Sequence, residues 1–156
     1  MTLSTDQTAP SADRQVTILI VEDEPITREV VVRSMEAAGF RTRSCSTGEE
    51  ALGILQTEGA GIDWLLTDVS LPGTVSGWVV GAEFHLSYPL RPVIYASARE
   101  PARYYTAGGV YVSKPCSPAK IVELIRQLTA QDTTRDHRTP ADRLSELLRG
   151  YALKAA

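Results

Sequence analysis

The stretch "TILIVEDEP", from Thr17 to Pro25, joins an apolar run directly to three carboxylates and a proline. Taken from Val16 to Val21, the run "VTILIV" is continuous and rich in β-branched residues, which is typical of a parallel strand covered on both faces. Acids at the end of such a strand would lie at the mouth of the core. The stretch therefore predicts a buried strand that leads into a site containing Glu22, Asp23 and Glu24.

Apolar runs and segments of helical spacing alternate along the rest of the chain. Further strands are expected at "RTRSCS" (41–46), "DWLLTD" (63–68), "PVIYAS" (92–97) and "GVYVSKP" (109–115). The weak apolar content of 41–46 is typical of an edge strand. Five alternations predict an α/β fold, a doubly wound five-stranded parallel sheet with helices on both faces. For this sheet we expect the flavodoxin-like strand order 2-1-3-4-5.

Helices are expected between these strands and after the last one, at 25–40, 46–59, 78–89 and 117–131. In the first helix, apolar residues near the helical period predict the buried face: Ile26, Val30, Met35 and Ala38. In the second, Ser46 stands three residues before Glu49, which is the spacing of a capping box. In the last, Ser117 is expected to cap the helix. Between the fourth and fifth strands, "AREPARYYTAG" (98–108) leaves room for only about two helical turns, so a shortened fourth helix is expected there.

Length and composition set the expected domain organisation. The 156 residues suit one domain, expected at 16–130, after a flexible polar arm at 1–15. Residues 131–156 are expected to form a polar linker and one amphipathic helix, too little chain for a DNA-reading module. This helix is expected to pack on its own domain, to mediate a homodimer or to bind a partner, and the sequence does not rank these roles.

Charge and cysteine content exclude several classes of partner. The formal net charge of −3 offers no basic surface for direct nucleic acid binding. No apolar run reaches the roughly 20 residues that span a bilayer, and the first residues lack a leader pattern, so a cytoplasmic protein without membrane insertion is expected. Cys45 and Cys116 are expected to be free thiols because they stand far apart and in no metal-binding motif.

Acids follow two strands that the predicted order makes neighbours. Glu22 and Asp23 follow the first strand and Asp68 ends the third, so all three should converge where ligands bind in such sheets. Two carboxylates about 5 Å apart repel each other by on the order of 3 kcal/mol at an effective dielectric constant of about 20, which favours a bound cation. Mg²⁺ fits best because it binds through one or two carboxylates together with phosphate. Glu24 is expected to lie on the surface.

A hydroxyl and an ammonium end the two remaining strands of this predicted crevice. Ser97 ends the fourth strand and Lys114 follows the fifth. Beside Mg²⁺, these groups suit the stabilisation of the charged oxygens of a transferring phosphoryl group. Asp68 is the preferred nucleophile, since it stands alone at the central strand end while Glu22 and Asp23 hold the metal.

Together these motifs resemble the receiver domain of two-component response regulators. The resemblance covers Val16 to about Ala130 and rests on "ED", "TDVSLPG", "YASA" and "VYVSKP", each after its strand in the right order. It implies that Asp68 accepts a phosphoryl group from a sensor histidine kinase or a phosphotransfer protein. It further implies that the backbone carbonyl of Ser70 joins the Mg²⁺ ligands, that Ser97 and Lys114 contact the phosphoryl oxygens, and that Tyr111 is the aromatic switch residue.

The chain also departs from this family's usual pattern. The loop "LPGTVSG" is one residue longer between Pro72 and Gly77, and the acidic pair is Glu-Asp instead of Asp-Asp. The shortened fourth helix implies an altered signalling surface. We expect a single-domain regulator that acts on an unknown downstream protein and is not an enzyme, apart from self-dephosphorylation.

Other functions on a related fold are weighed against this expectation. A scaffold that works without phosphorylation would not need the full set of acids, serine and lysine, whereas a phosphate sink or shuttle in a relay would. A phosphatase of the haloacid dehalogenase type needs a second Asp at position 70, where this chain has Ser70. A nucleotide-binding Rossmann protein needs a glycine-rich turn in place of "EDEP".

Overall fold

Five strands form one parallel sheet in the computed structural model, which describes residues 15–99 and 109–131. The strands are β1 (Thr17–Val21), β2 (Arg41–Cys45), β3 (Trp64–Asp68), β4 (Val93–Ser97) and β5 (Gly109–Ser113). Their order across the sheet is β2-β1-β3-β4-β5, with β2 at an edge, and every adjacent pair is parallel. The predicted α/β fold, doubly wound with strand order 2-1-3-4-5, is confirmed.

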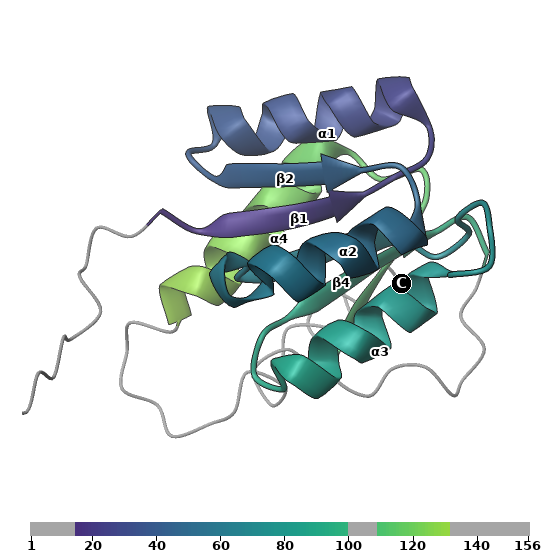
Figure 1. Ribbon diagram of the computed structural model, residues 1–156. Coiled ribbons are helices and arrows are strands. Elements are labelled where there is room, and N and C mark those ends of the chain that lie inside the picture. Colours follow the sequence, from purple (N-terminus) through teal and green to yellow (C-terminus); the bar gives the residue numbers. More distant parts are fainter. Residues whose placement is uncertain (1–14, 100–108, 132–156) are drawn as a thin grey trace, which may run out of the picture.

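Helices cover both faces of this sheet. They are α1 (Pro25–Ala37), α2 (Gly48–Glu58), α3 (Gly77–Ser87) and α4 (Pro118–Gln131), with the short 3₁₀ helix η1 (Gly59–Gly61) after α2. The helices α1 and α4 contact each other, as do α2 and α3, and Figure 1 shows the second pair side by side in front of the strands. The sheet therefore has a separate apolar core on each face.

Alternate side chains of β1 supply the two cores. Ile18 and Ile20 pack with residues of α1 and α4, whereas Leu19 and Val21 pack with residues of α2 and α3. None of the four is more than 1% exposed. The apolar run is continuous because β1 has helices on both sides and so has no polar face, as the sequence predicted.

The buried face of α1 agrees with the prediction only in part. Val31 and Met35 face the sheet, while Ile26 is 74% exposed and Val30 is 49% exposed. Ala38 packs at the margin of the core. The prediction is confirmed for Met35 and wrong for Ile26 and Val30, because Ile26 and Val30 have the same four-residue spacing as Val31 and Met35 and the period alone does not separate the two pairs.

Two predicted helix starts have different outcomes. Thr47, not Ser46, caps α2, because the Thr47 hydroxyl accepts a hydrogen bond from the Glu50 amide at 3.1 Å. The Glu50 carboxylate in turn accepts a hydrogen bond from the Ser46 amide. The predicted capping box was therefore one residue too early, and Glu49 is left for another contact. At α4 the predicted cap is confirmed, since the hydroxyl of Ser117 accepts a hydrogen bond from the backbone of the first turn at 3.3 Å.

Several predictions fall on parts of the chain that the structure does not describe. The predicted arm at 1–15, the shortened fourth helix at 98–108 and the C-terminal segment at 131–156 lie outside the described residues except at their boundaries.

Both cysteines are free, as predicted. Within residues 15–99 and 109–131, no helix has the length and apolar character needed to cross a membrane.

Candidate functional site

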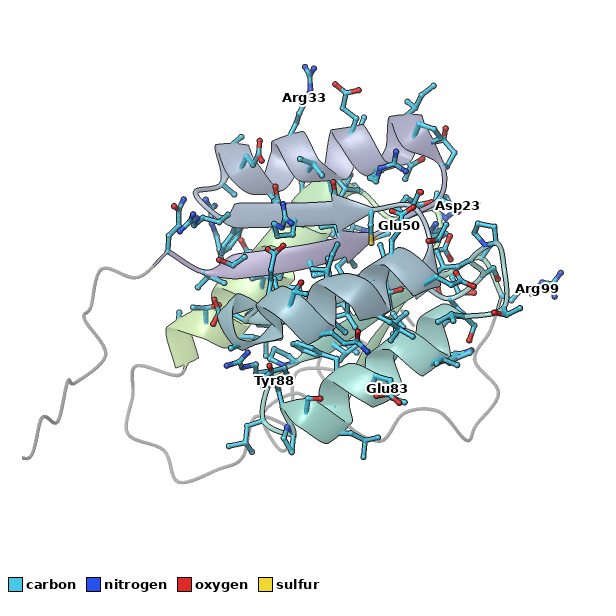
Figure 2. The ribbon with its side chains drawn as sticks, in the orientation of Figure 1. Asp23, Arg33, Glu50, Glu83, Tyr88 and Arg99 are labelled. Carbon is cyan, nitrogen blue, oxygen red and sulfur yellow. The ribbon has the colours of Figure 1, made fainter. Side chains whose placement is uncertain are left out.

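Three carboxylates converge at the carboxyl ends of β1 and β3. Glu22 and Asp23 directly follow β1, Asp68 ends β3, and one oxygen from each lies within 4.8 Å of the others. The side chains of Glu22 and Asp68 are only 9% and 10% exposed, whereas Asp23 is open to solvent. Figure 2 shows Asp23 beyond the C-terminal ends of the strands, at the same end of the molecule as Arg99. The predicted acidic cluster therefore exists in the fold.

Lys114 lies inside this cluster. Its Nζ donates hydrogen bonds to Glu22 Oε2 at 2.7 Å and to Asp68 Oδ2 at 2.9 Å. The backbone amide of Lys114 donates to the Ser97 carbonyl at 2.7 Å, which fixes the residue at the end of the sheet. Burial lowers the pKa of Lys114, but the hydrogen bonds to Glu22 and Asp68 and their charges raise it by more, so the pKa is raised overall. The ammonium offsets part of the repulsion between the two buried acids.

Backbone contacts hold Asp68 in place. The amide of Ser70 donates to Asp68 Oδ1 at 3.0 Å, so the two carboxylate oxygens of Asp68 have different partners, Ser70 and Lys114. The hydroxyl of Thr67, which is fully buried, donates to the Asp68 carbonyl at 2.9 Å. A Cβ atom at Gly77 would lie 1.9 Å from that carbonyl oxygen, so only glycine fits there. The start of α3 is thus packed directly against the backbone of Asp68.

A contact that the sequence did not predict fixes the backbone of Glu22. Arg28 on α1 donates from Nη1 to the Glu22 carbonyl at 2.7 Å. Glu24 lies outside the cluster, as expected, and caps α1 by accepting hydrogen bonds from the amides of Ile26 and Thr27. Hydrogen bonds from Thr27 lower the pKa of Glu24. No short motif marks Arg28, although its position one turn into a helix that starts at the site was a signal for such a contact.

Ser97 and Tyr111 lie on the two strands next to the cluster. Ser97 ends β4 and is 5% exposed, and its hydroxyl accepts a hydrogen bond from the Arg99 amide at 3.1 Å. Tyr111 pairs with Tyr95 across β4 and β5 and packs with the α2–α3 side of the core. The Tyr111 hydroxyl is buried and has no hydrogen-bond partner among the residues that the structure describes. The roles given to Ser97 and Tyr111 remain predictions.

An apolar cavity of about 400 Å³ adjoins the cluster on the α1–α4 side. Glu22, Asp68 and Lys114 contribute to its lining, and Val31 and Ile121 are among its apolar wall residues. Apolar walls lower the local dielectric constant and strengthen the charge interactions at the site.

The donor set fits Mg²⁺. Three carboxylates can each offer an oxygen from positions within 4.8 Å of one another, and hard divalent cations prefer oxygen ligands. Ser70, whose carbonyl is the predicted fourth ligand, borders the cluster because its amide binds Asp68. One side of the cluster is open to solvent at the exposed Asp23, so an ion could reach the three carboxylates from that side.

The sheet topology, with acids and a lysine at the carboxyl ends of its strands, defines a doubly wound α/β protein with a ligand site at the point where the strand order reverses. Residues 18–126 match the response regulator receiver domain, so the chain belongs to that family. The resemblance drawn from the motifs is confirmed.

Individual relatives and solved structures agree with this assignment. The probable transcriptional regulatory protein TcrX of Mycobacterium tuberculosis is 32% identical over 123 residues, which cover 75% of this chain and 51% of the relative. This chain thus spans about half the length of that relative. A response regulator receiver protein from Sinorhizobium medicae is 27% identical with a TM-score of 0.67, over 73% of this chain and 94% of the other.

Receiver domains attached to kinases are also similar to this chain. The sensor kinase CckA of Brucella abortus is 31% identical over 81 residues, which cover 52% of this chain and 8% of the kinase. The crystallised receiver domain of the hybrid histidine kinase CckA is 31% identical with a TM-score of 0.62, over 71% of this chain and 96% of the other.

Proposed function

We propose that Asp68 accepts a phosphoryl group from a phosphohistidine on a sensor histidine kinase or a phosphotransfer protein. The observation that carries this proposal is the position of Asp68, nearly buried, hydrogen-bonded to Lys114 and within 4.8 Å of two further carboxylates. Placing carboxylates this close together and away from water is unfavourable, because burial removes the hydration of their charges. Acids with no role beyond facing the solvent would not be held in this way. It suits a carboxylate that reacts with a highly charged group.

Transfer of the phosphoryl group from the donor histidine to Asp68 needs no further reactant. An oxygen of the Asp68 carboxylate forms a bond to phosphorus, the phosphorus–nitrogen bond to the donor imidazole breaks, and its electron pair stays on the imidazole nitrogen. The product is an aspartyl phosphate. Lys114, already 2.9 Å from Asp68, exchanges part of its contact with the carboxylate for a contact with the phosphoryl oxygens. The Ser97 hydroxyl, at the end of the neighbouring strand, is the second proposed donor to them.

Glu22, Asp23, Asp68 and the Ser70 carbonyl are the proposed holders of Mg²⁺. The ion supplies positive charge that lowers the repulsion between the acids and the incoming phosphoryl group. The chain's own contribution is position: Arg28 fixes the backbone of Glu22, and the Ser70 amide fixes Asp68.

We further propose a cytoplasmic single-domain regulator that signals through contacts with a downstream protein or a second copy of itself. Adding roughly −1.5 to −2 charges at Asp68 is the local event, and repacking between β4 and β5 around Tyr111 is the proposed readout. In this proposal the chain is not an enzyme for a separate substrate, and the aspartyl phosphate is lost by slow self-dephosphorylation. The similarity to the sensor kinase CckA and to the receiver domain of a hybrid histidine kinase supports a kinase as the phosphoryl donor.

Incubation with acetyl phosphate tests the proposal without knowledge of the cognate kinase. We expect intact mass spectrometry to show one added phosphoryl group in the wild type with Mg²⁺, and little or none with EDTA or in Asp68→Asn. An unlabelled wild type would leave the scaffold that works without phosphorylation as the better account.

A further inference from the structure

The carboxylate of Glu49 binds the loop that follows Asp68. This loop, residues 69–76, connects β3 to α3 and is called the 69–76 loop below. Glu49 Oε1 accepts three hydrogen bonds, from the Thr74 amide at 2.9 Å, the Thr74 hydroxyl at 3.1 Å and the Val75 amide at 3.2 Å. One oxygen atom at the start of α2 therefore holds two consecutive residues of a loop about 25 positions further along the chain.

The backbones of α2 and the 69–76 loop approach each other closely at the same place. Gly73 has a φ of +85°, and a Cβ atom there would lie 2.7 Å from Glu49 Oε1. A Cβ atom at Gly48 would lie 2.3 Å from the Val75 carbonyl oxygen. The two glycines let the loop lie directly against the start of α2. The hydrogen bonds of Glu49 are therefore part of a close backbone contact between α2 and the loop.

The 69–76 loop is anchored to Asp68 at both of its ends. At its start, the Ser70 amide donates to the Asp68 carboxylate. At its end, the Gly77 amide donates to the Val69 carbonyl at 3.0 Å, and the Gly77 Cα packs against the Asp68 carbonyl. The middle of the loop has Glu49 as its side-chain anchor.

We propose that Glu49 is a positioning residue for the phosphoacceptor site, because it holds the 69–76 loop in the conformation that presents Ser70 and Asp68 to the metal and the phosphoryl group. The inference rests on the proposed function and adds to it a residue outside the acidic cluster. Glu49 acts through the loop and does not touch the reacting atoms. Hydrogen bonds lower the pKa of Glu49, and the one from the Thr74 amide has the largest effect. The lowered pKa agrees with a charged anchor at neutral pH.

Three variants of the full chain test this role. Glu49→Ala removes the acceptor, whereas Glu49→Gln keeps an oxygen that can accept from Thr74 and Val75. Glu50→Ala is the matched control, because Glu50 is the adjacent acid of the same helix and binds Ser46 instead of the loop. If Glu49→Ala and Glu50→Ala changed loop exchange and Mg²⁺ affinity equally, the cause would be damage to α2, and the inference would be wrong.

The first readout needs no metal and no phosphodonor. Amide hydrogen exchange of the 69–76 loop should become about tenfold faster in Glu49→Ala, because two amides lose their acceptor, and should stay near wild type in Glu49→Gln and Glu50→Ala. Unchanged exchange in Glu49→Ala would overturn the inference, since the loop would not depend on the contact.

The second readout is Mg²⁺ affinity by calorimetry, with the rate of labelling by acetyl phosphate beside it. We expect about tenfold weaker Mg²⁺ binding in Glu49→Ala, at the lower end of the loss caused by removing an outer hydrogen-bonding partner, and near recovery in Glu49→Gln. Faster loop exchange with wild-type Mg²⁺ affinity and labelling would also overturn the inference. If the wild type binds Mg²⁺ but is never labelled, the proposed function fails, while loop exchange and Mg²⁺ affinity still decide the role of Glu49.

Discussion

Lys114 is the residue on which the charge balance of the site depends. It holds Glu22 and Asp68 with hydrogen bonds of 2.7 and 2.9 Å, and its side chain is 27% exposed. Lys114→Met should lower the free energy of unfolding in EDTA by about 1–3 kcal/mol, less than the loss of one partner from a fully buried pair because water screens this one. Mg²⁺ should then raise the Tm of the variant more than that of the wild type, since it relieves a greater repulsion. Equal Mg²⁺-dependent Tm shifts in the two proteins would contradict this account.

The raised pKa of Lys114 also sets a pH dependence. A group whose pKa is higher in the folded state stabilises the fold below its unfolded pKa, about 10.4 for lysine, and this contribution is lost as the pH rises through the folded value. The stability difference between wild type and Lys114→Met should therefore be constant near neutral pH and shrink in alkali. Urea unfolding of both proteins from about pH 8 to about pH 11 measures it. A difference that grows over this range would show that the sign is wrong.

At the scale of single elements, the orientation of α1 is the main correction to the sequence prediction. Met35 is fully buried and Ile26 is 74% exposed. Met35→Ala should cost about 2–5 kcal/mol of unfolding free energy, whereas Ile26→Ala should change it by no more than about 0.5 kcal/mol. Chemical denaturation of the two variants distinguishes the orientations, because the face predicted from the sequence would make both substitutions costly.

The contact between α3 and the end of β3 predicts a second difference between matched variants. Gly77→Ala should destabilise the fold by about 1–3 kcal/mol and weaken labelling, because its Cβ would overlap the Asp68 carbonyl oxygen. Gly53→Ala in α2 is the control, since a Cβ there meets nothing within 4 Å and alanine should stabilise a helix interior by about 0.5–1 kcal/mol. A neutral Gly77→Ala variant would mean that α3 does not pack as closely on Asp68 as described here.

Elements differ in how well the sequence predicted them. Strands such as β1 and β4 could be predicted because burial on both faces demands continuous apolar runs, and their bounds agree with the structure within one residue. Helix faces and caps could not be fixed as well. In α1 two apolar pairs had equal spacing, and at α2 Ser46 and Thr47 are neighbouring hydroxyl residues that precede neighbouring acids. In both cases the choice depended on tertiary contacts.

At the scale of the whole molecule, the topology accounts for most of what could be predicted of the site. Parallel strands present their carboxyl ends on one edge, so motifs scattered between Glu22 and Lys114 could be assigned to one place from the order of the strands alone. The direct hydrogen bonds of Lys114 to two acids, the contact of Arg28 and the anchor at Glu49 were not predicted. Each depends on the geometry of a side chain in the folded protein, which no short motif encodes.

The most direct test of the central claim is to locate the phosphoryl group on the chain. After labelling with acetyl phosphate and Mg²⁺, borohydride reduction of the acyl phosphate and peptide mass spectrometry identify the modified acid. The account predicts one Mg²⁺-dependent modification, at Asp68. Modification at Glu22, at Asp23 or elsewhere, or labelling of Asp68 that is equally strong in EDTA, would contradict it.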